Sequence, residues 1–133
     1  MIKPHPDATV AELLTFYDRR GPAWRIGPGR QPALIVIDFS CAFTQSESPF
    51  PGISFDAEIA ATIRLLDAVR SRGWPVIFTT IAYDSPERDA GFWRVKIPWL
   101  ERCALGSSLV AIDARLRRTA DEHVLVKHYP SSF

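Results

Sequence analysis

Two charged side chains stand where buried strands are expected to end. Asp38 closes the apolar run "ALIVID" at residues 33–38, and Lys127 closes "VLVK" at residues 124–127. A charge at the rim of a buried strand loses hydration and needs a compensating partner. A carboxylate beside an ammonium suits proton transfer, because the carboxylate can take a proton from a nucleophile and return it to a leaving group. We therefore expect Asp38 and Lys127 to form one functional pair.

Either charge alone also has an ordinary structural explanation. Asp38 would cap a turn in the loop that follows the strand, and the Lys127 stem would lie over apolar neighbours while its ammonium reaches solvent. The two together favour a functional site, because the carboxyl ends of parallel strands share one edge of a sheet and charged groups in such environments mark sites.

The pair lacks a nucleophile. Cys41 lies in the loop that follows Asp38, but a small buried thiol in a loop more often serves packing, and only Lys127 could lower its pKa. Cys103 falls in an expected short helix beside Leu100, which is more typical of a core position. Neither cysteine is therefore expected to attack a substrate.

Three short apolar runs, at residues 33–38, 75–80 and 124–127, are typical of strands buried on both faces. Between the first two, residues 55–73 carry apolar side chains at helical spacing, so this part of the chain predicts strand, crossover helix and parallel strand. The predicted fold class is α/β with a parallel sheet, in which ligands bind beyond the carboxyl ends of the strands.

Other segments predict shorter elements. Residues 9–20 favour a leading helix with Thr9 as a possible N-cap, and the Gly- and Pro-rich residues 21–32 favour a linker. Local helices are expected near residues 98–103 and 113–120. The domain organisation is therefore a lead-in over residues 1–32 and an α/β domain over residues 33–133.

Composition limits the classes of partner and the location. Sixteen Lys and Arg against fifteen Asp and Glu leave the net charge near zero, which gives no reason to expect nucleic acid or an acidic membrane surface. No apolar stretch approaches the roughly 20 residues of a membrane span, and the N-terminus lacks the apolar core of a secretion signal, which favours a cytoplasmic location. The three histidines show no ligand spacing with each other or with the cysteines, so no metal site is expected.

Four segments, taken in order, resemble the isochorismatase-like cysteine hydrolases: "ALIVIDFSCAF", "PVIFTTIAY", "DAGFWRVKIPWL" and "VLVKHYPSSF". The resemblance is strongest to the branch that contains N-carbamoylsarcosine amidase and similar amidohydrolases. It implies a doubly wound, three-layer α/β fold, of which this chain would hold about three parallel strands. It also implies that Asp38 is the catalytic aspartate and Lys127 the catalytic lysine. Residues that stand where this family lines its substrate pocket are Phe43, Thr80, Tyr83 and Trp93.

The resemblance implies hydrolysis of a C–N bond in a small amide, carbamoyl or ureido compound, with no organic cofactor. A cysteine attacks the carbonyl, Asp38 accepts its proton and later protonates the leaving amine, and Lys127 stabilises the thiolate and orients the carboxylate. The loop "SESPFPGISF" offers no histidine for the metal-binding set of the related nicotinamidase branch, which argues against zinc.

In the family the nucleophilic cysteine begins a helix after a fourth strand, and this sequence ends before any such strand. We therefore expect residues 33–133 to be the N-terminal part of a domain that is inactive alone. The chain would be completed by a complementary C-terminal segment, and a homo-oligomer is expected. A naturally short domain, whose edge is closed by the N-terminal helix, is the alternative.

Two other functions stay open. In a non-covalent vinyl ether hydrolase of the isochorismatase type, Asp38 would act as general acid without any cysteine. A non-catalytic binding or assembly module would use an aromatic surface, although tryptophans in a chain of this size mostly pack in the core or at interfaces. The tryptophans in question are Trp24, Trp74, Trp93 and Trp99.

Overall fold

The computed structural model describes residues 9–19, 29–45 and 54–132, which fall into two compact units, residues 1–31 and 32–133. The first unit contains helix α1 (Val10–Arg19). Its N-terminus is a capping box: the Glu12 backbone N–H donates to Thr9 Oγ1 (3.3 Å), and the Thr9 N–H donates to Glu12 Oε2 (2.8 Å). The predicted helix and its Thr9 cap are confirmed. Most of the predicted linker lies outside the described residues.

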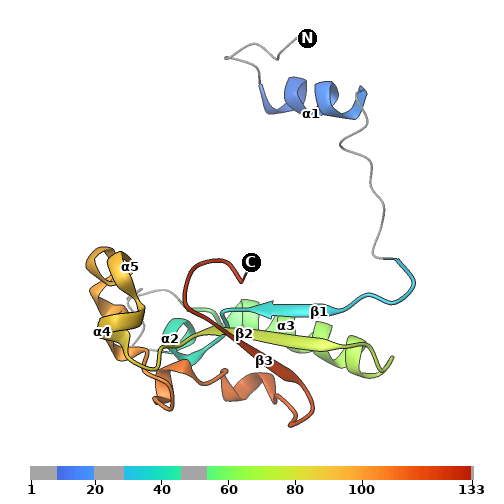
Figure 1. Cartoon of the computed structure of the whole chain (residues 1–133). Helices are drawn as coiled ribbons and strands as arrows, with labels where there is room; N and C mark the ends of the chain where they lie inside the picture. The colour runs from blue at the N-terminus through green and yellow to red at the C-terminus, as the bar shows by residue number, and fades with distance from the viewer. Residues whose placement is uncertain (1–8, 20–28, 46–53, 133) are drawn as a thin grey trace. The chain divides into compact units, whose positions relative to one another are not determined.

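The second unit is built on a three-stranded parallel sheet in the order β1-β2-β3 (Figure 1). The strands are β1 (Leu34–Ile37), β2 (Val76–Ile81) and β3 (His123–Lys127). All three match the positions of the apolar runs in the sequence, and the α/β fold class with parallel strands is confirmed. The predicted burial on both faces holds for β2 but is wrong for β1 and β3, most of whose residues are exposed or half-buried because one face of the sheet has no covering layer among the described residues of this unit. The three carboxyl ends lie at one edge of the sheet.

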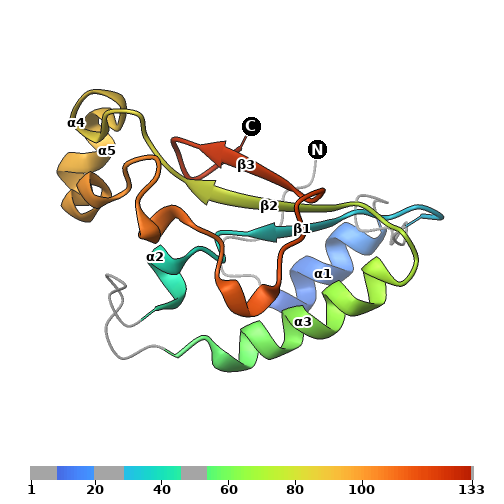
Figure 2. The same ribbon diagram turned by 90° about the horizontal axis from the view of Figure 1, so that it is seen from below.

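Helix α3 (Asp56–Arg70) is the crossover between β1 and β2 and covers one face of the sheet (Figure 2). Apolar residues that recur at helical spacing on α3 pack against the strand residues whose side chains point toward the helix. This face of the sheet is therefore buried. The buried core of this layer consists of Val36, Ile59, Leu66, Val76, Phe78 and Leu116.

The opposite face of the sheet is more open. The register sets Ile37, Thr79 and Leu125 side by side across the three strands. The residues Ile35 and Ile37 are 50% and 60% exposed, and Leu125 is 43% exposed. Within residues 32–45 and 54–132, no helix covers this strip.

The connection from β2 to β3 holds only short helices: α4 (Pro86–Asp89), α5 (Gly91–Lys96) and three 3-10 helices, η1 (Pro98–Arg102), η2 (Ser108–Val110) and η3 (Ala114–Leu116). The helix predicted near residues 98–103 is therefore present as a 3-10 helix. The helix predicted over residues 113–120 is wrong in extent, because Arg117 adopts a left-handed conformation (φ 49°) that ends η3 after one turn. The first loop contains α2 (Cys41–Thr44).

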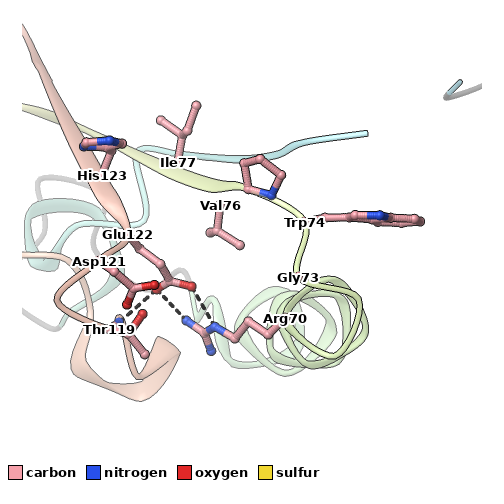
Figure 3. Close-up of a pocket in the computed structure, with 10 residues that line it drawn as sticks. Arg70, Gly73, Trp74, Val76, Ile77, Thr119, Asp121, Glu122 and His123 are labelled. Atoms are coloured by element: carbon pink, nitrogen blue, oxygen red, sulfur yellow. Dashed lines mark hydrogen bonds and ion pairs between the residues drawn. The ribbon is translucent and has the colours of Figure 1, made fainter. Parts of the chain in front are cut away.

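A buried ion pair joins the end of α3 to the residue that precedes β3 (Figure 3). Arg70 Nε and Nη2 donate to the two Glu122 carboxylate oxygens at 2.7 and 2.8 Å, and the Thr119 N–H donates to Oε2 at 2.9 Å. The Glu122 side chain is 6% exposed. The Arg70 guanidinium holds the pKa of this carboxyl below its ordinary value. The pair borders an open cavity of about 490 Å³ at the amino ends of β2 and β3.

Substituting Glu122→Gln is expected to lower the free energy of unfolding at pH 7 by about 2 kcal/mol, because it leaves a partly buried guanidinium without its counterion. Since the pKa of Glu122 is lower in the folded state than in the unfolded state, its contribution is complete above about pH 5 and declines as the pH falls. Urea unfolding at pH 7 and pH 3 measures this, and the difference between wild type and variant should shrink at pH 3.

The matched control is Glu101→Gln, which breaks the solvent-exposed pair between Arg94 and Glu101. It should change stability by no more than about 0.5 kcal/mol. Equal effects of the two substitutions would contradict the structural importance of the Arg70–Glu122 pair.

Candidate active site

The carboxyl edge of the sheet brings Asp38 and Lys127 into direct contact. Lys127 Nζ donates to Asp38 Oδ2 at 2.7 Å and to the Pro130 carbonyl oxygen at 2.8 Å. The Lys127 side chain is 3% exposed, whereas the Asp38 side chain is 26% exposed. The ammonium is therefore buried with two acceptors, and the carboxylate keeps access to solvent. The structure brings together the two charges that the sequence sets at strand ends, and their catalytic role stays a prediction.

Thr79 also contacts Asp38, from the neighbouring strand. Its hydroxyl donates to Asp38 Oδ1 at 2.9 Å and accepts a hydrogen bond from the Asp38 backbone N–H at 3.2 Å. Thr79 and Thr80 both end the second predicted strand, where function is expected, but the family resemblance placed only Thr80 in the substrate pocket. Adjacent strand residues point to opposite faces, so only the register of β1 against β2 distinguishes the two threonines.

An apolar cavity of about 260 Å³ lies beside the pair. Among the described residues that line it, Asp38 is the one with a charge, and the others are aromatic or aliphatic. Two of the predicted pocket residues, Phe43 and Trp93, are part of this wall. The lining residues are Asp38, Phe43, Ile81, Trp93, Ile97, Trp99, Leu100 and Pro130.

The other two predicted pocket residues do not line this cavity. The Thr80 hydroxyl donates to the Val110 carbonyl at 2.8 Å, and the Tyr83 hydroxyl donates to the His128 carbonyl at 2.6 Å. Both side chains are buried, and burial raises the pKa of Tyr83 to about 12. Their hydroxyls hold neighbouring loops against β2, and their role in substrate binding stays a prediction.

The three tryptophans that the structure describes do not form one aromatic surface. Trp93 and Trp99 line the cavity, whereas Trp74 lies at the amino edge of the sheet beside Arg72, whose guanidinium is 5.4 Å from the ring centroid. Trp24 lies outside the described residues. Within the part of the chain that the structure describes, the tryptophans therefore form no continuous patch of the kind that a binding module would use.

Neither cysteine has the environment of a nucleophile. Burial raises the pKa of the Cys41 thiol, and the nearby Asp113 carboxylate raises it further. Gln45 Nε2 also donates to Cys41 Sγ at 3.0 Å. Burial raises the pKa of Cys103 to about 11. Reactive cysteines have lowered pKa values, so both thiols fit the structural role expected for them.

A carboxylate–guanidinium network holds α2, the helix that carries Phe43. Arg115 donates to both Asp113 oxygens, at 2.9 and 2.7 Å, and the Thr44 hydroxyl donates to Asp113 Oδ2 at 2.6 Å. These bonds, led by those from Arg115, lower the pKa of Asp113 to about 2. Arg115 also reaches Asp56 at the start of α3, at 2.6 Å. The network therefore fixes one wall of the cavity to the helical layer.

Residues 9–19, 29–45 and 54–132 contain neither a metal-ligand cluster nor a membrane-spanning helix. No group of three or more His, Cys, Asp or Glu side chains there could hold a metal ion. In the same part of the chain, every helix is too short or too polar to cross a bilayer.

The chain is a parallel α/β unit with an acid–lysine pair and an apolar cavity at its carboxyl edge. This arrangement is the one expected of an isochorismatase-like protein. The Isochorismatase domain model matches residues 32–133. The chain therefore belongs to the isochorismatase family, as its sequence motifs predict.

Relatives and solved structures agree with this membership. N-carbamoylsarcosine amidase of Arthrobacter is 36% identical, over 90% of this chain and 47% of that protein. Maleamate amidohydrolase of Pseudomonas putida is 38% identical, over 82% of this chain and 52% of that protein. A crystal structure of an isochorismatase family protein from Desulfovibrio vulgaris superposes with a TM-score of 0.63 at 27% identity, over 76% of this chain and 54% of that chain. The chain spans about half the length of the curated relatives it matches.

Proposed function

We propose that this chain supplies the acid–base pair and part of the substrate cavity of a cysteine amidohydrolase that cleaves the C–N bond of a small amide, carbamoyl or ureido compound. The observation that carries the proposal is the 2.7 Å ion pair between Lys127 and Asp38 beside an apolar cavity. Family membership and the names of the two relatives, an amidase and an amidohydrolase, support the reaction class.

In the proposed mechanism a cysteine from outside this chain attacks the carbonyl carbon, because the pKa values of Cys41 and Cys103 are raised. Asp38 takes the thiol proton as the S–C bond forms, and it gives that proton to the nitrogen as the C–N bond breaks. Water then hydrolyses the thioester, with Asp38 taking a proton from the water and returning one to the departing thiolate.

Lys127 acts in this scheme through its fixed position. The Pro130 carbonyl and the Asp38 carboxylate hold its ammonium, so its charge is in place before the substrate arrives. A preorganised cation stabilises a developing thiolate at no further cost in reorganisation. The apolar wall that includes Phe43 and Trp93 would hold the body of the substrate and exclude water from the reacting atoms.

The test uses the full-length gene product and a panel of small amides, carbamoyl and ureido compounds, with ammonia release as the readout. We expect turnover of at least one compound, and we expect mass spectrometry of the quenched enzyme to find an acyl group on a cysteine that is not Cys41 or Cys103. Ammonia release that persists after this cysteine is alkylated would overturn the covalent mechanism.

We extend this proposal to the assembly of the enzyme and to its location in the cell. We propose that the exposed strip of Ile35, Ile37 and Leu125 is covered in the working enzyme, either by a complementary C-terminal segment or by a second copy in a homo-oligomer, because such apolar strips are poorly tolerated in water. The isolated 133-residue chain is expected to be inactive. We propose a cytoplasmic enzyme.

A further inference from the structure

We propose that Thr79 is a positioning residue for Asp38, whose hydroxyl fixes both the backbone and the carboxylate of the acid–base group. The inference rests on the proposed function, because it assumes that Asp38 transfers the proton. Neither the family match nor the two relatives assign a role to this threonine.

The backbone conformation of Asp38 needs stabilising contacts from other residues. Asp38 has φ 60°, in the left-handed region that non-glycine residues seldom occupy, although aspartate tolerates it better than most. Such conformations persist where surrounding contacts determine them. The hydrogen bond from the Asp38 N–H to Thr79 Oγ1, at 3.2 Å, is a contact of this kind.

The same hydroxyl orients the side chain. A threonine hydroxyl has one hydrogen to donate and two lone pairs to accept. Thr79 gives its hydrogen to Asp38 Oδ1 and accepts from the Asp38 N–H, so one oxygen atom joins two points of the same residue. Lys127 occupies the other carboxylate oxygen. Each carboxylate oxygen keeps a further lone pair that could receive the transferred proton.

Thr79 is itself held in place. It lies on β2, the central strand, between Ile37 on β1 and Leu125 on β3, and it is 4% exposed. A β-branched side chain on a strand has few rotamers available. Functional groups held by regular strands are positioned more exactly than those held by loops. The Thr79 hydroxyl therefore has a fixed position, and it can fix the position of Asp38, which begins a loop.

The neighbouring Thr80 provides a matched comparison. It lies on the same strand, is similarly buried at 3% exposed, and its hydroxyl also makes a buried hydrogen bond. The acceptor of that bond is the Val110 carbonyl and not Asp38. Removal of the Thr80 hydroxyl therefore measures the general effect of deleting a buried hydroxyl from β2.

The first experiment observes the Asp38 amide directly, by ¹H–¹⁵N NMR and hydrogen exchange of the full-length gene product. In Thr79→Val the Asp38 amide proton should move upfield and exchange about tenfold faster, because it loses its acceptor. In Thr80→Val the same signal should stay in place. An Asp38 amide that is unchanged in Thr79→Val would overturn the inference, whatever the activity of the enzyme.

The second experiment measures kinetics in the full-length gene product. Thr79→Val should lower kcat by about 10- to 100-fold through a misplaced carboxylate, with KM changed by less than about threefold. Thr79→Ser keeps the hydroxyl and should restore most of kcat. If Thr79→Val fails to fold, the comparison of Thr79→Ser with Thr79→Ala serves instead, because both lack the methyl group and differ only in the hydroxyl.

The kinetic outcomes separate the two proposals. A Thr79→Ser variant as slow as Thr79→Val or Thr79→Ala would overturn the positioning role, because the hydroxyl would then make no difference. Full activity of an Asp38→Ala variant would instead overturn the proposed function. In that case the amide signal would still report whether Thr79 holds Asp38 in place.

Discussion

Replacing Lys127 by methionine is expected to abolish amide hydrolysis while leaving the fold about as stable as before. The substitution removes the ammonium that we propose stabilises the thiolate, which should reduce kcat/KM by about 10³-fold, within the range for loss of a group in acid–base chemistry. The stability expectation follows from burial: the Lys127 side chain is 3% exposed, and an apolar chain of similar length fills its space. Replacing a buried charge by a well-packed apolar group is often neutral in stability, within about 1 kcal/mol.

The measurement pairs an activity assay of the full-length gene product with urea unfolding of the same protein. The Asp38 carboxylate that Lys127→Met leaves behind is 26% exposed and keeps the Thr79 hydroxyl as a donor, so water and Thr79 can solvate it. Arg64→Met, which removes an exposed positive charge from α3, is the control and should change neither readout. Retained activity in Lys127→Met would exclude the proposed role of the lysine.

The substitution Asp38→Asn is expected to remove both activity and stability. An amide cannot take a proton from a thiol at neutral pH, so kcat should fall by about 10²- to 10⁴-fold. In contrast to the lysine variant, this change leaves the buried ammonium with only the Pro130 carbonyl and a neutral amide as acceptors. An uncompensated buried charge should cost about 3 kcal/mol of folding free energy.

The double variant Asp38→Asn/Lys127→Met tests this asymmetry. It should recover most of the stability that Asp38→Asn loses, and it should remain inactive. A double variant as unstable as Asp38→Asn would show that the loss comes from Asp38 itself, through its backbone or its bond to Thr79, and not from the stranded ammonium. Equal stability of Asp38→Asn and wild type would contradict the burial argument altogether.

The sequence was sufficient for the sheet and for the charged pair because both depend on local patterns. Continuous apolar runs mark strands of a parallel sheet, although only β2 is buried on both faces in this structure, and a charge that ends such a run must lie at the carboxyl edge. Asp38 and Lys127 are 89 positions apart in the chain, yet both follow from this rule. The family motifs added the expected reaction class.

Other parts of the site depend on contacts that no local pattern contains. The choice between Thr79 and Thr80 requires the register between β1 and β2. Only part of the cavity wall was predicted, because Trp99 reaches it from a five-residue 3-10 helix whose sequence has no clear period. The Arg115 network joins three segments that are distant in sequence, and it became apparent only with the fold.

Apart from its backbone pairing with β2, the strand β3 is held by ion pairs at its two ends. Glu122, just before it, pairs with Arg70, and Lys127, its last residue, pairs with Asp38. Between them, Val124, Leu125 and Val126 are 37%, 43% and 44% exposed, so little apolar burial anchors the middle of the strand. Salt and acid weaken ion pairs more than they weaken hydrophobic packing. Local opening of β3 would therefore separate Lys127 from Asp38 while the α3 core is still intact, and loss of function would precede loss of the fold.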